Sequence, residues 1–161
     1  MKVLLTSCLV FIFSIHLTAQ DCNCCSPKQI AFDFWVGEWT VYDTTGQEVG
    51  KNSIKKLESG CILNEHWRGS KGSTGRSYNY FDLKDSTWNQ LWIDNKGGNL
   101  KLKGNTSQEG IMILKSDLIK GKKDFYYNQI AWTKMSEDEV VQLWEVYRKD
   151  QTKIAELFRG I

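Results

Sequence analysis

The spacing of apolar and polar residues along the chain changes once, at Gly37. Between Ser26 and Trp35 the apolar positions recur every three to four residues. This spacing predicts a short helix, which Ser26 can cap and Pro27 can begin. After Gly37 the apolar positions alternate with a period of two, which is typical of strands with one buried face. We therefore predict one short helix followed by an all-β domain.

Turn residues divide the region after Gly37 into about ten segments of strand length. The predicted strands cover residues 38–43, 48–59, 60–69, 75–83, 87–94, 99–106, 111–119, 124–135, 140–149 and 153–161. Their short connections make each strand antiparallel to the next. Because twist and unpaired edges drive such a meander to close, we expect an antiparallel up-and-down barrel, plugged by the N-terminal helix. A barrel of this size can enclose a ligand-sized cavity.

The first twenty residues have the layout of a secretory signal peptide. Lys2 precedes an apolar run from Val3 to about Leu17, and small and polar residues follow. The run is short for a membrane span, and no other stretch approaches one. We divide the chain into a signal peptide (1–20), a cysteine-rich segment (21–26) and a barrel domain (27–161).

Cleavage of the leader predicts an exported protein, either periplasmic or secreted. Lipid attachment to Cys22 is the less favoured alternative. It requires a small residue directly before the cysteine, and Gln20 and Asp21 stand there instead.

Four cysteines follow the leader, at positions 22, 24, 25 and 61. An even number in an exported chain fits two disulfides. Since the adjacent Cys24 and Cys25 would strain to bond each other, we expect Cys61 to pair with one of the other three. That bond would fasten the N-terminal segment to the domain. A metal site formed by "CNCC" and Cys61 stays open, although its spacing differs from that of structural zinc sites.

The overall composition is that of a soluble globular protein, with 41% hydrophobic and 25% charged residues. The net charge of +2 gives no broad basic field, so we expect no nucleic-acid partner. We expect a small-molecule ligand, no membrane span, no cofactor, and a monomer or homodimer.

The stretch "FDFWVGEW" places four aromatic residues in eight positions. An up-and-down barrel has an open end, and large apolar side chains before the first strand can fill it. The residues predicted to do so are Phe32, Phe34 and Trp35. Gly37 lets the chain bend sharply into the first strand, and Trp39 then points into the barrel floor. We assign structural roles to Gly37, Trp39 and Cys61.

Four phrases of the sequence resemble a bacterial family of small calycin-like, or lipocalin-like, barrels of unknown function. They are "FDFWVGEW", "SGCILNEHW", "GRSYNYFD" and "WNQLWID", which occur in the family's order between Phe32 and about Asn99. The C-terminal strands match only in their pattern. The resemblance implies a lipocalin-like barrel, without an established reaction or ligand.

The Gly-x-Trp sequence at residues 37–39 is also similar to the start of strand one in lipocalins. There an Arg or Lys from a late strand covers the Trp, which makes Arg148 and Arg159 the candidates here. A related branch resembling nitrobindins binds haem through a histidine near the chain end. After the leader this chain has only His66, within a predicted strand, so we expect no haem by that route.

Several predicted strands place polar groups and large aromatic residues on one face. Glu65 alternates in phase with Trp67, and Gln90 lies between Trp88 and Trp92. An aromatic cavity with a few fixed polar groups is typical of a small-molecule site. We predict that the cavity binds a small apolar or amphipathic ligand. The predicted wall is Trp67, Tyr80, Trp88 and Trp92, and the predicted orienting groups are Glu65, Gln90 and Arg148.

Two alternatives from other classes stay open. One is a small calycin-type enzyme, such as a cyclase, decarboxylase or hydrolase, in which Glu65 and Glu145 act as an acid/base pair. The sequence contains no nucleophile elbow, and one histidine after the leader offers little for a triad. The other is a structural or interaction module with a filled core. In that case the aromatic stripes are simply core, because a shift of one residue inverts the faces of a strand.

Overall fold

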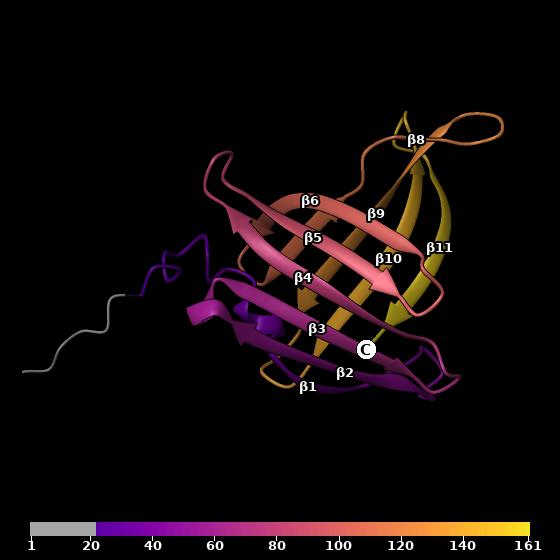
Figure 1. The fold of residues 1–161 in the computed structure, drawn as a ribbon. Helices are drawn as coiled ribbons and strands as arrows, with labels where there is room; N and C mark the ends of the chain where they lie inside the picture. Colours follow the sequence, from indigo (N-terminus) through magenta and orange to yellow (C-terminus); the bar gives the residue numbers. More distant parts are fainter. Residues whose placement is uncertain (1–21) are drawn as a thin grey trace, which may run out of the picture.

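A computed structural model describes residues 22–161 as a nearly closed antiparallel barrel, and the predicted signal peptide lies outside the described residues (Figure 1). Ten strands pair in chain order, and the two-residue strand β8 pairs with β9 beside that path. The strands are β1 (Gly37–Tyr42), β2 (Glu48–Leu57), β3 (Ile62–Gly69), β4 (Thr74–Asp82), β5 (Thr87–Asp94), β6 (Asn99–Gln108), β7 (Ile111–Lys115), β8 (Ile119–Lys120), β9 (Phe125–Lys134), β10 (Val140–Arg148) and β11 (Lys153–Gly160). The predicted all-β up-and-down barrel is confirmed.

Within residues 22–161, one pair of backbone hydrogen bonds closes the barrel. Tyr42 at the end of β1 and Ile161 after β11 exchange two bonds, each with a donor–acceptor distance of 2.9 Å. The strand predicted over residues 111–119 is divided into β7 and β8. The division falls at Ser116, where the Ser116 Oγ accepts a bond from the Asn128 N–H.

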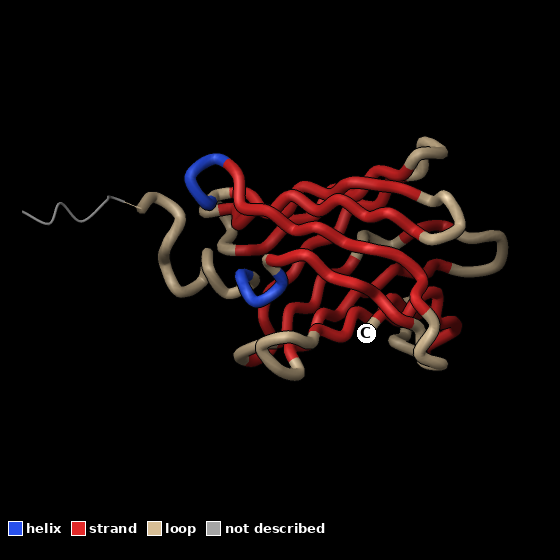
Figure 2. The backbone as a smooth tube through the Cα atoms, turned by 90° about the horizontal axis from the view of Figure 1, so that it is seen from below, coloured by secondary structure: helices blue, strands red, loops and turns tan. Residues whose placement is uncertain are grey.

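The predicted N-terminal helix is wrong, because the described residues contain only two short 3₁₀ turns, η1 (Asp33–Trp35) and η2 (Glu58–Gly60). Both lie at the same end of the barrel (Figure 2). Ser26 donates its hydroxyl to Gln29, but the hydrogen bonds from Ser26 onward are those of successive turns. A helix of a few residues gains too little to offset nucleation, so packing of the aromatic side chains decides the backbone here.

The aromatic residues before β1 nevertheless plug the barrel as predicted. Phe32 is fully buried, and its ring lies 5.0 to 5.5 Å from the rings of Trp35, Trp88 and Trp132. Phe34 is partly buried against the same cluster. These rings and the aliphatic side chains of several strands form the hydrophobic core at this end.

Gly37 and Trp39 form the bend that leads the chain from η1 into β1. The φ angle of Gly37 is +154°, and a Cβ there would meet the indole of Trp39. That indole turns back to donate a 2.9 Å hydrogen bond to the Trp35 carbonyl. The one cation–π contact found within residues 22–161 joins Lys115 and Tyr127. Neither Arg148 nor Arg159 therefore covers Trp39 in this way, which corrects the expectation from lipocalins.

Two disulfides join the four described cysteines, as Cys22–Cys25 and Cys24–Cys61. The second fastens the N-terminal segment to the barrel, as expected for Cys61. Because each of the four sulfurs belongs to one of these two disulfides, "CNCC" offers no thiolate to a metal. Disulfides persist in oxidising compartments, so this bonding indicates an extracytoplasmic environment.

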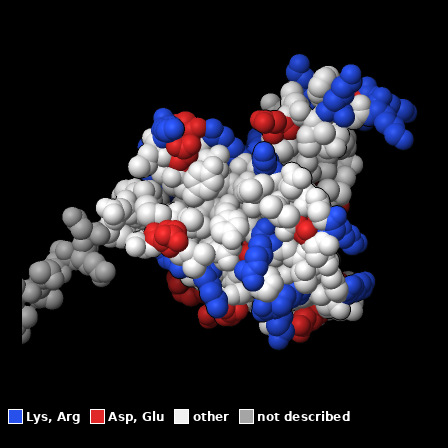
Figure 3. All heavy atoms as spheres, viewed as in Figure 1, with Lys and Arg blue, Asp and Glu red and all other residues white. Residues whose placement is uncertain are grey.

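Charged side chains of both signs are interspersed over the face seen in Figure 3. Basic side chains gather at one end of this face, around Lys120 of β8 and the following turn, which contains Lys122 and Lys123. Within residues 22–161, no helix combines the length and the apolar character needed to cross a bilayer.

We predict that Phe32→Ala lowers the free energy of unfolding by about 3 to 5 kcal/mol, because it opens a void among the packed rings. Urea titration at equilibrium measures the change. Phe125→Ala is the matched control, since Phe125 is 44% exposed. Equal losses of unfolding free energy in the two variants would contradict the role of Phe32 in packing the plug.

We also predict that the Cys24→Ser/Cys61→Ser double variant loses about 2 to 4 kcal/mol of stability, because its disulfide closes a long loop over a sequence separation of 37. The matched Cys22→Ser/Cys25→Ser variant opens a loop with a separation of only 3 and should lose less. Thermal unfolding of both variants without reductant checks the order, which a larger loss in the short-loop variant would refute.

Candidate functional site

Residues that face the barrel interior change character along its axis. On β3 the inward positions are Leu63 in the core, then Glu65, then Trp67. On β5 the same order of apolar, polar and aromatic residues is Trp88, Gln90 and Trp92. The interior therefore has an apolar layer at the plug, a polar layer above it, and an aromatic layer towards the other end. Glu65, Trp67, Gln90 and Trp92 therefore all face the interior, a choice of face that the sequence leaves open.

The polar layer is a chain of hydrogen bonds that ends at Glu65. Gln90 donates to Asn79 at 2.8 Å, Asn79 donates to Ser77 at 2.8 Å, and Ser77 donates to Glu65 Oε2 at 2.7 Å. Asn52 on β2 donates to Glu65 Oε1 at 2.8 Å. Every donor in the chain thus points towards the carboxylate, which is the arrangement in which successive bonds polarise one another.

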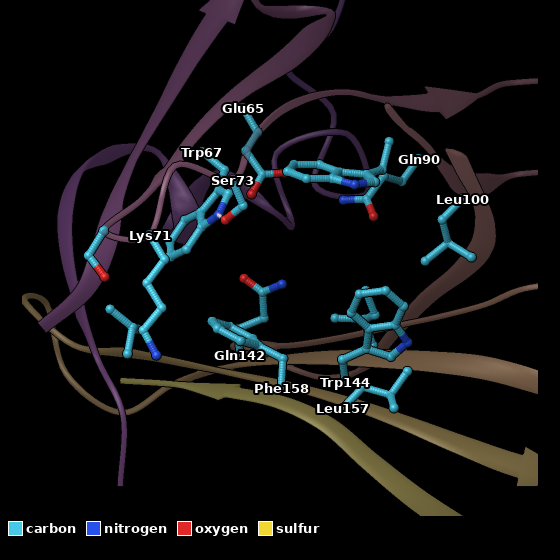
Figure 4. A pocket seen from close by; sticks show the side chains of 14 residues that line it. Glu65, Trp67, Lys71, Ser73, Gln90, Leu100, Gln142, Trp144, Leu157 and Phe158 are labelled. Carbon is cyan, nitrogen blue, oxygen red and sulfur yellow. Dashed lines mark hydrogen bonds between the residues drawn. The ribbon is translucent and has the colours of Figure 1, made fainter. Parts of the chain in front are cut away.

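The aromatic layer surrounds a cavity of about 410 Å³ (Figure 4). Its lining residues come from β2, β3, β5, β6, β9, β10, β11 and the β3–β4 loop; they are Val49, Glu65, Trp67, Ser70, Lys71, Ser73, Gln90, Trp92, Leu100, Ile130, Gln142, Trp144, Leu157 and Phe158. Ser70, Lys71 and Ser73 are exposed in the β3–β4 loop. That loop follows the end of β3 opposite η2, so the cavity opens away from the plug.

Glycines make room for two of the indoles. A Cβ at Gly50 of β2 would overlap the ring of Trp67, and one at Gly75 of β4 would overlap the ring of Trp92. The indole N–H of Trp144 donates to Asn128 at 2.9 Å. The Trp67 and Phe158 rings contact edge to face, with centroids 5.9 Å apart. The cavity wall is thus held by packing and hydrogen bonds.

Glu65 is the buried ionisable group of this cavity, with 4% of its surface exposed. Burial raises its pKa from 4.5 to about 6, and the hydrogen bonds from Ser77 and Asn52 oppose that rise. None of the ion pairs within residues 22–161 includes Glu65. The carboxyl therefore changes charge near pH 6, inside a largely apolar space.

Four of the seven residues predicted to bind a ligand line the cavity, namely Glu65, Trp67, Gln90 and Trp92. Trp88 does not, because its ring is 3% exposed within the plug and its N–H donates to the Lys28 carbonyl at 3.0 Å. Tyr80 is 43% exposed on the outer face of β4, and Arg148 is exposed at the last position of β10. These placements correct the expectations for Trp88, Tyr80 and Arg148.

Sequence reasoning missed the half of the wall contributed by β6, β10, β11 and the β3–β4 loop. The missed residues include Leu100, Gln142, Trp144, Phe158 and Lys71. Alternation could have found Gln142 and Trp144, which share a face of β10. It could not have found both Leu157 and Phe158. A bulge in β11 sets Leu157 between the partners of Trp144 and Glu145, so two successive residues line the cavity.

Glu65 and Glu145 lie on opposite sides of the barrel wall. Glu145 pairs in register with Gln129, whose neighbours Asn128 and Ile130 are the buried residues of β9. It accepts hydrogen bonds from Tyr147 at 2.7 Å and Lys153 at 2.8 Å. Burial acts to raise the pKa of Glu145, but these bonds outweigh it and lower that pKa. The predicted acid/base pair of Glu65 and Glu145 is therefore not assembled.

His66 faces away from the cavity, as its alternation with Glu65 and Trp67 predicts. Its Nδ1 lies 3.2 Å from the Arg68 guanidinium and 3.3 Å from that of Arg76. Burial and these two cations lower the pKa of His66.

The barrel is consistent with a calycin-like fold. Comparison of the sequence with protein-family models and with curated proteins gives no match.

We predict that Glu65→Gln becomes more stable relative to the wild-type protein as pH rises. The folded-state pKa of Glu65 is raised, so its contribution to stability is present below about pH 4.5 and lost as pH rises through about 6. The rise in the pKa of Glu65 from 4.5 to about 6 corresponds to about 2 kcal/mol in the free energy of unfolding. Urea titrations on both sides of this range measure it.

Glu38→Gln is the control, because Glu38 is exposed and the hydrogen bond from Ser53 lowers its pKa. The control should show no relative gain on raising the pH. A stability difference between Glu65→Gln and wild type that stays constant across this range would contradict the raised pKa.

Proposed function

We propose that this is an exported lipocalin-like protein that binds one small apolar or amphipathic molecule in the barrel cavity. The observation that carries the proposal is the cavity of about 410 Å³, open at one end and lined by aromatic and aliphatic side chains. Its volume lies in the range of small-molecule sites, about 300 to 1,000 Å³. Its few polar groups are the carboxyl of Glu65, the amides of Gln90 and Gln142, and groups of the β3–β4 loop.

Binding is favoured over the two alternatives by the same geometry. An enzyme using Glu65 and Glu145 would need both carboxyls at one substrate, and the barrel wall separates them. A module with a filled core would need the interior to be closed, whereas only the plug end is packed. Transfer of an apolar ligand into this space stabilises the complex by removing its surface and that of the indoles from water.

The test uses N-phenyl-1-naphthylamine, a neutral apolar probe that fluoresces strongly away from water. We predict saturable binding of one probe per protein, with energy transfer from the tryptophans. Leu100→Trp/Gln142→Trp places two large side chains in the cavity and should weaken binding about tenfold or more, because each additional ring occupies ligand volume.

The matched control is Lys101→Trp/Leu143→Trp, which adds the same side chains at neighbouring positions on the outer face. It should bind the probe as the wild type does. Absence of probe binding by the wild type, or equal binding by the two double variants, would overturn the proposal.

A further inference from the structure

The carboxyl of Glu65 is the one anionic group that lines the cavity, and no cation within residues 22–161 pairs with it. Both of its oxygens accept bonds from protein donors, Asn52 on one side and Ser77 on the other. An ionised carboxylate therefore keeps lone pairs free on the cavity side but lacks a counter-charge. A buried, unpaired charge is costly, and a ligand that supplies the opposite charge recovers that cost.

Aromatic rings surround the space into which Glu65 points. Trp67, Trp92, Trp144 and Phe158 line it from four different strands. Figure 4 shows the Glu65 carboxylate directed into the space bounded by Trp67, Trp144 and Phe158. The faces of such rings attract organic cations, and cages of aromatic residues are the usual site for ammonium groups. A carboxylate beside several indoles combines the two interactions that an alkylammonium head group can make at once.

We propose that the cavity selects amphipathic organic cations, with the ligand's ammonium group at Glu65 and its apolar body against Trp67, Trp92, Trp144 and Phe158. This inference rests on the proposed function and adds the chemical class of the ligand. Both interactions strengthen in a site that excludes water. The amides of Gln90 and Gln142 point into the same space and can accept a further N–H of the ammonium group (Figure 4).

Lys71 is the other charged side chain of the lining, and it lies in the exposed β3–β4 loop at the mouth. The strands on either side of Glu65 present to it only the uncharged Asn52 and Ser77. A ligand anion would therefore meet a cation only at the mouth and would face Glu65 in the interior. The interior favours a cationic head group, and the mouth is where an anionic one would have to bind.

The test is a series of three naphthalenes of nearly equal size: 1-naphthylmethylammonium, 1-naphthylmethanol and 1-naphthoate. Binding to the wild-type protein is measured by isothermal titration calorimetry at about pH 8, where Glu65 is ionised. We expect the ammonium compound to bind at least about tenfold more tightly than the alcohol, as a charge-assisted bond exceeds a neutral one. We expect the carboxylate to bind most weakly.

Two observations assign the preference to Glu65. In Glu65→Gln the ratio of ammonium to alcohol affinity should fall to about one, whereas the exposed Glu38→Gln control should keep the wild-type ratio. In the unmodified protein, ammonium affinity should fall about tenfold between about pH 8 and about pH 5, because protonation of Glu65 near pH 6 removes the negative charge. The affinity for the alcohol should stay constant, and this pH profile needs no variant to fold.

The outcomes separate this inference from the proposed function. If neither N-phenyl-1-naphthylamine nor any naphthalene binds, the proposed function itself fails. If the apolar probe binds but the ammonium compound binds no more tightly than the alcohol, only the preference for cations is overturned. Tightest binding of naphthoate, lost in Lys71→Gln, would also overturn it and would move ligand recognition to the mouth.

Discussion

Packing of Phe32 among tryptophan rings is the interaction on which the rest of this barrel depends. Phe32 contacts Trp35 from the same N-terminal segment, Trp88 from β5 and Trp132 from β9, so one cluster joins distant parts of the sheet. An up-and-down barrel of this size would otherwise admit water from both ends. Because the cluster seals one end, the interior becomes a cup, and the carboxyl of Glu65 above it lies away from solvent with a raised pKa.

The polar layer between the plug and the cavity satisfies the hydrogen-bonding groups of its buried side chains but leaves one charge unpaired. Its amides and hydroxyl bond one another, which removes most of the cost of burying them. The donors of this chain lead to Glu65, however, so the layer ends in a negative charge that no cation within residues 22–161 neutralises. A structure built only for stability would favour an apolar side chain there. An arrangement held rigidly before any ligand arrives is what small-molecule recognition requires.

The seam of the barrel gives the cavity its shape. Within residues 22–161, the only backbone bonds across this seam are those between Tyr42 of β1 and Ile161 after β11, and the bulge in β11 brings Leu157 as well as Phe158 into the cavity lining. Contact between Trp67 and Phe158 then joins the two halves through side chains instead of backbone.

The sequence by itself determined the order of the strands, their bounds to within a few residues, which residues of β3 and β5 share a face, and the structural positions of Gly37 and Cys61. Local rules suffice for these, since alternation, turn residues and short connections act between neighbours. Only the tertiary structure decided that the predicted helix is a set of turns and that Trp88 belongs to the plug while Trp92 lines the cavity. It also decided that Glu65 and Glu145 lie on opposite sides of the wall. Each of these depends on barrel closure, depth along the axis, or the bulge in β11, which arise from contacts between residues far apart in the chain and leave no periodic signal in it.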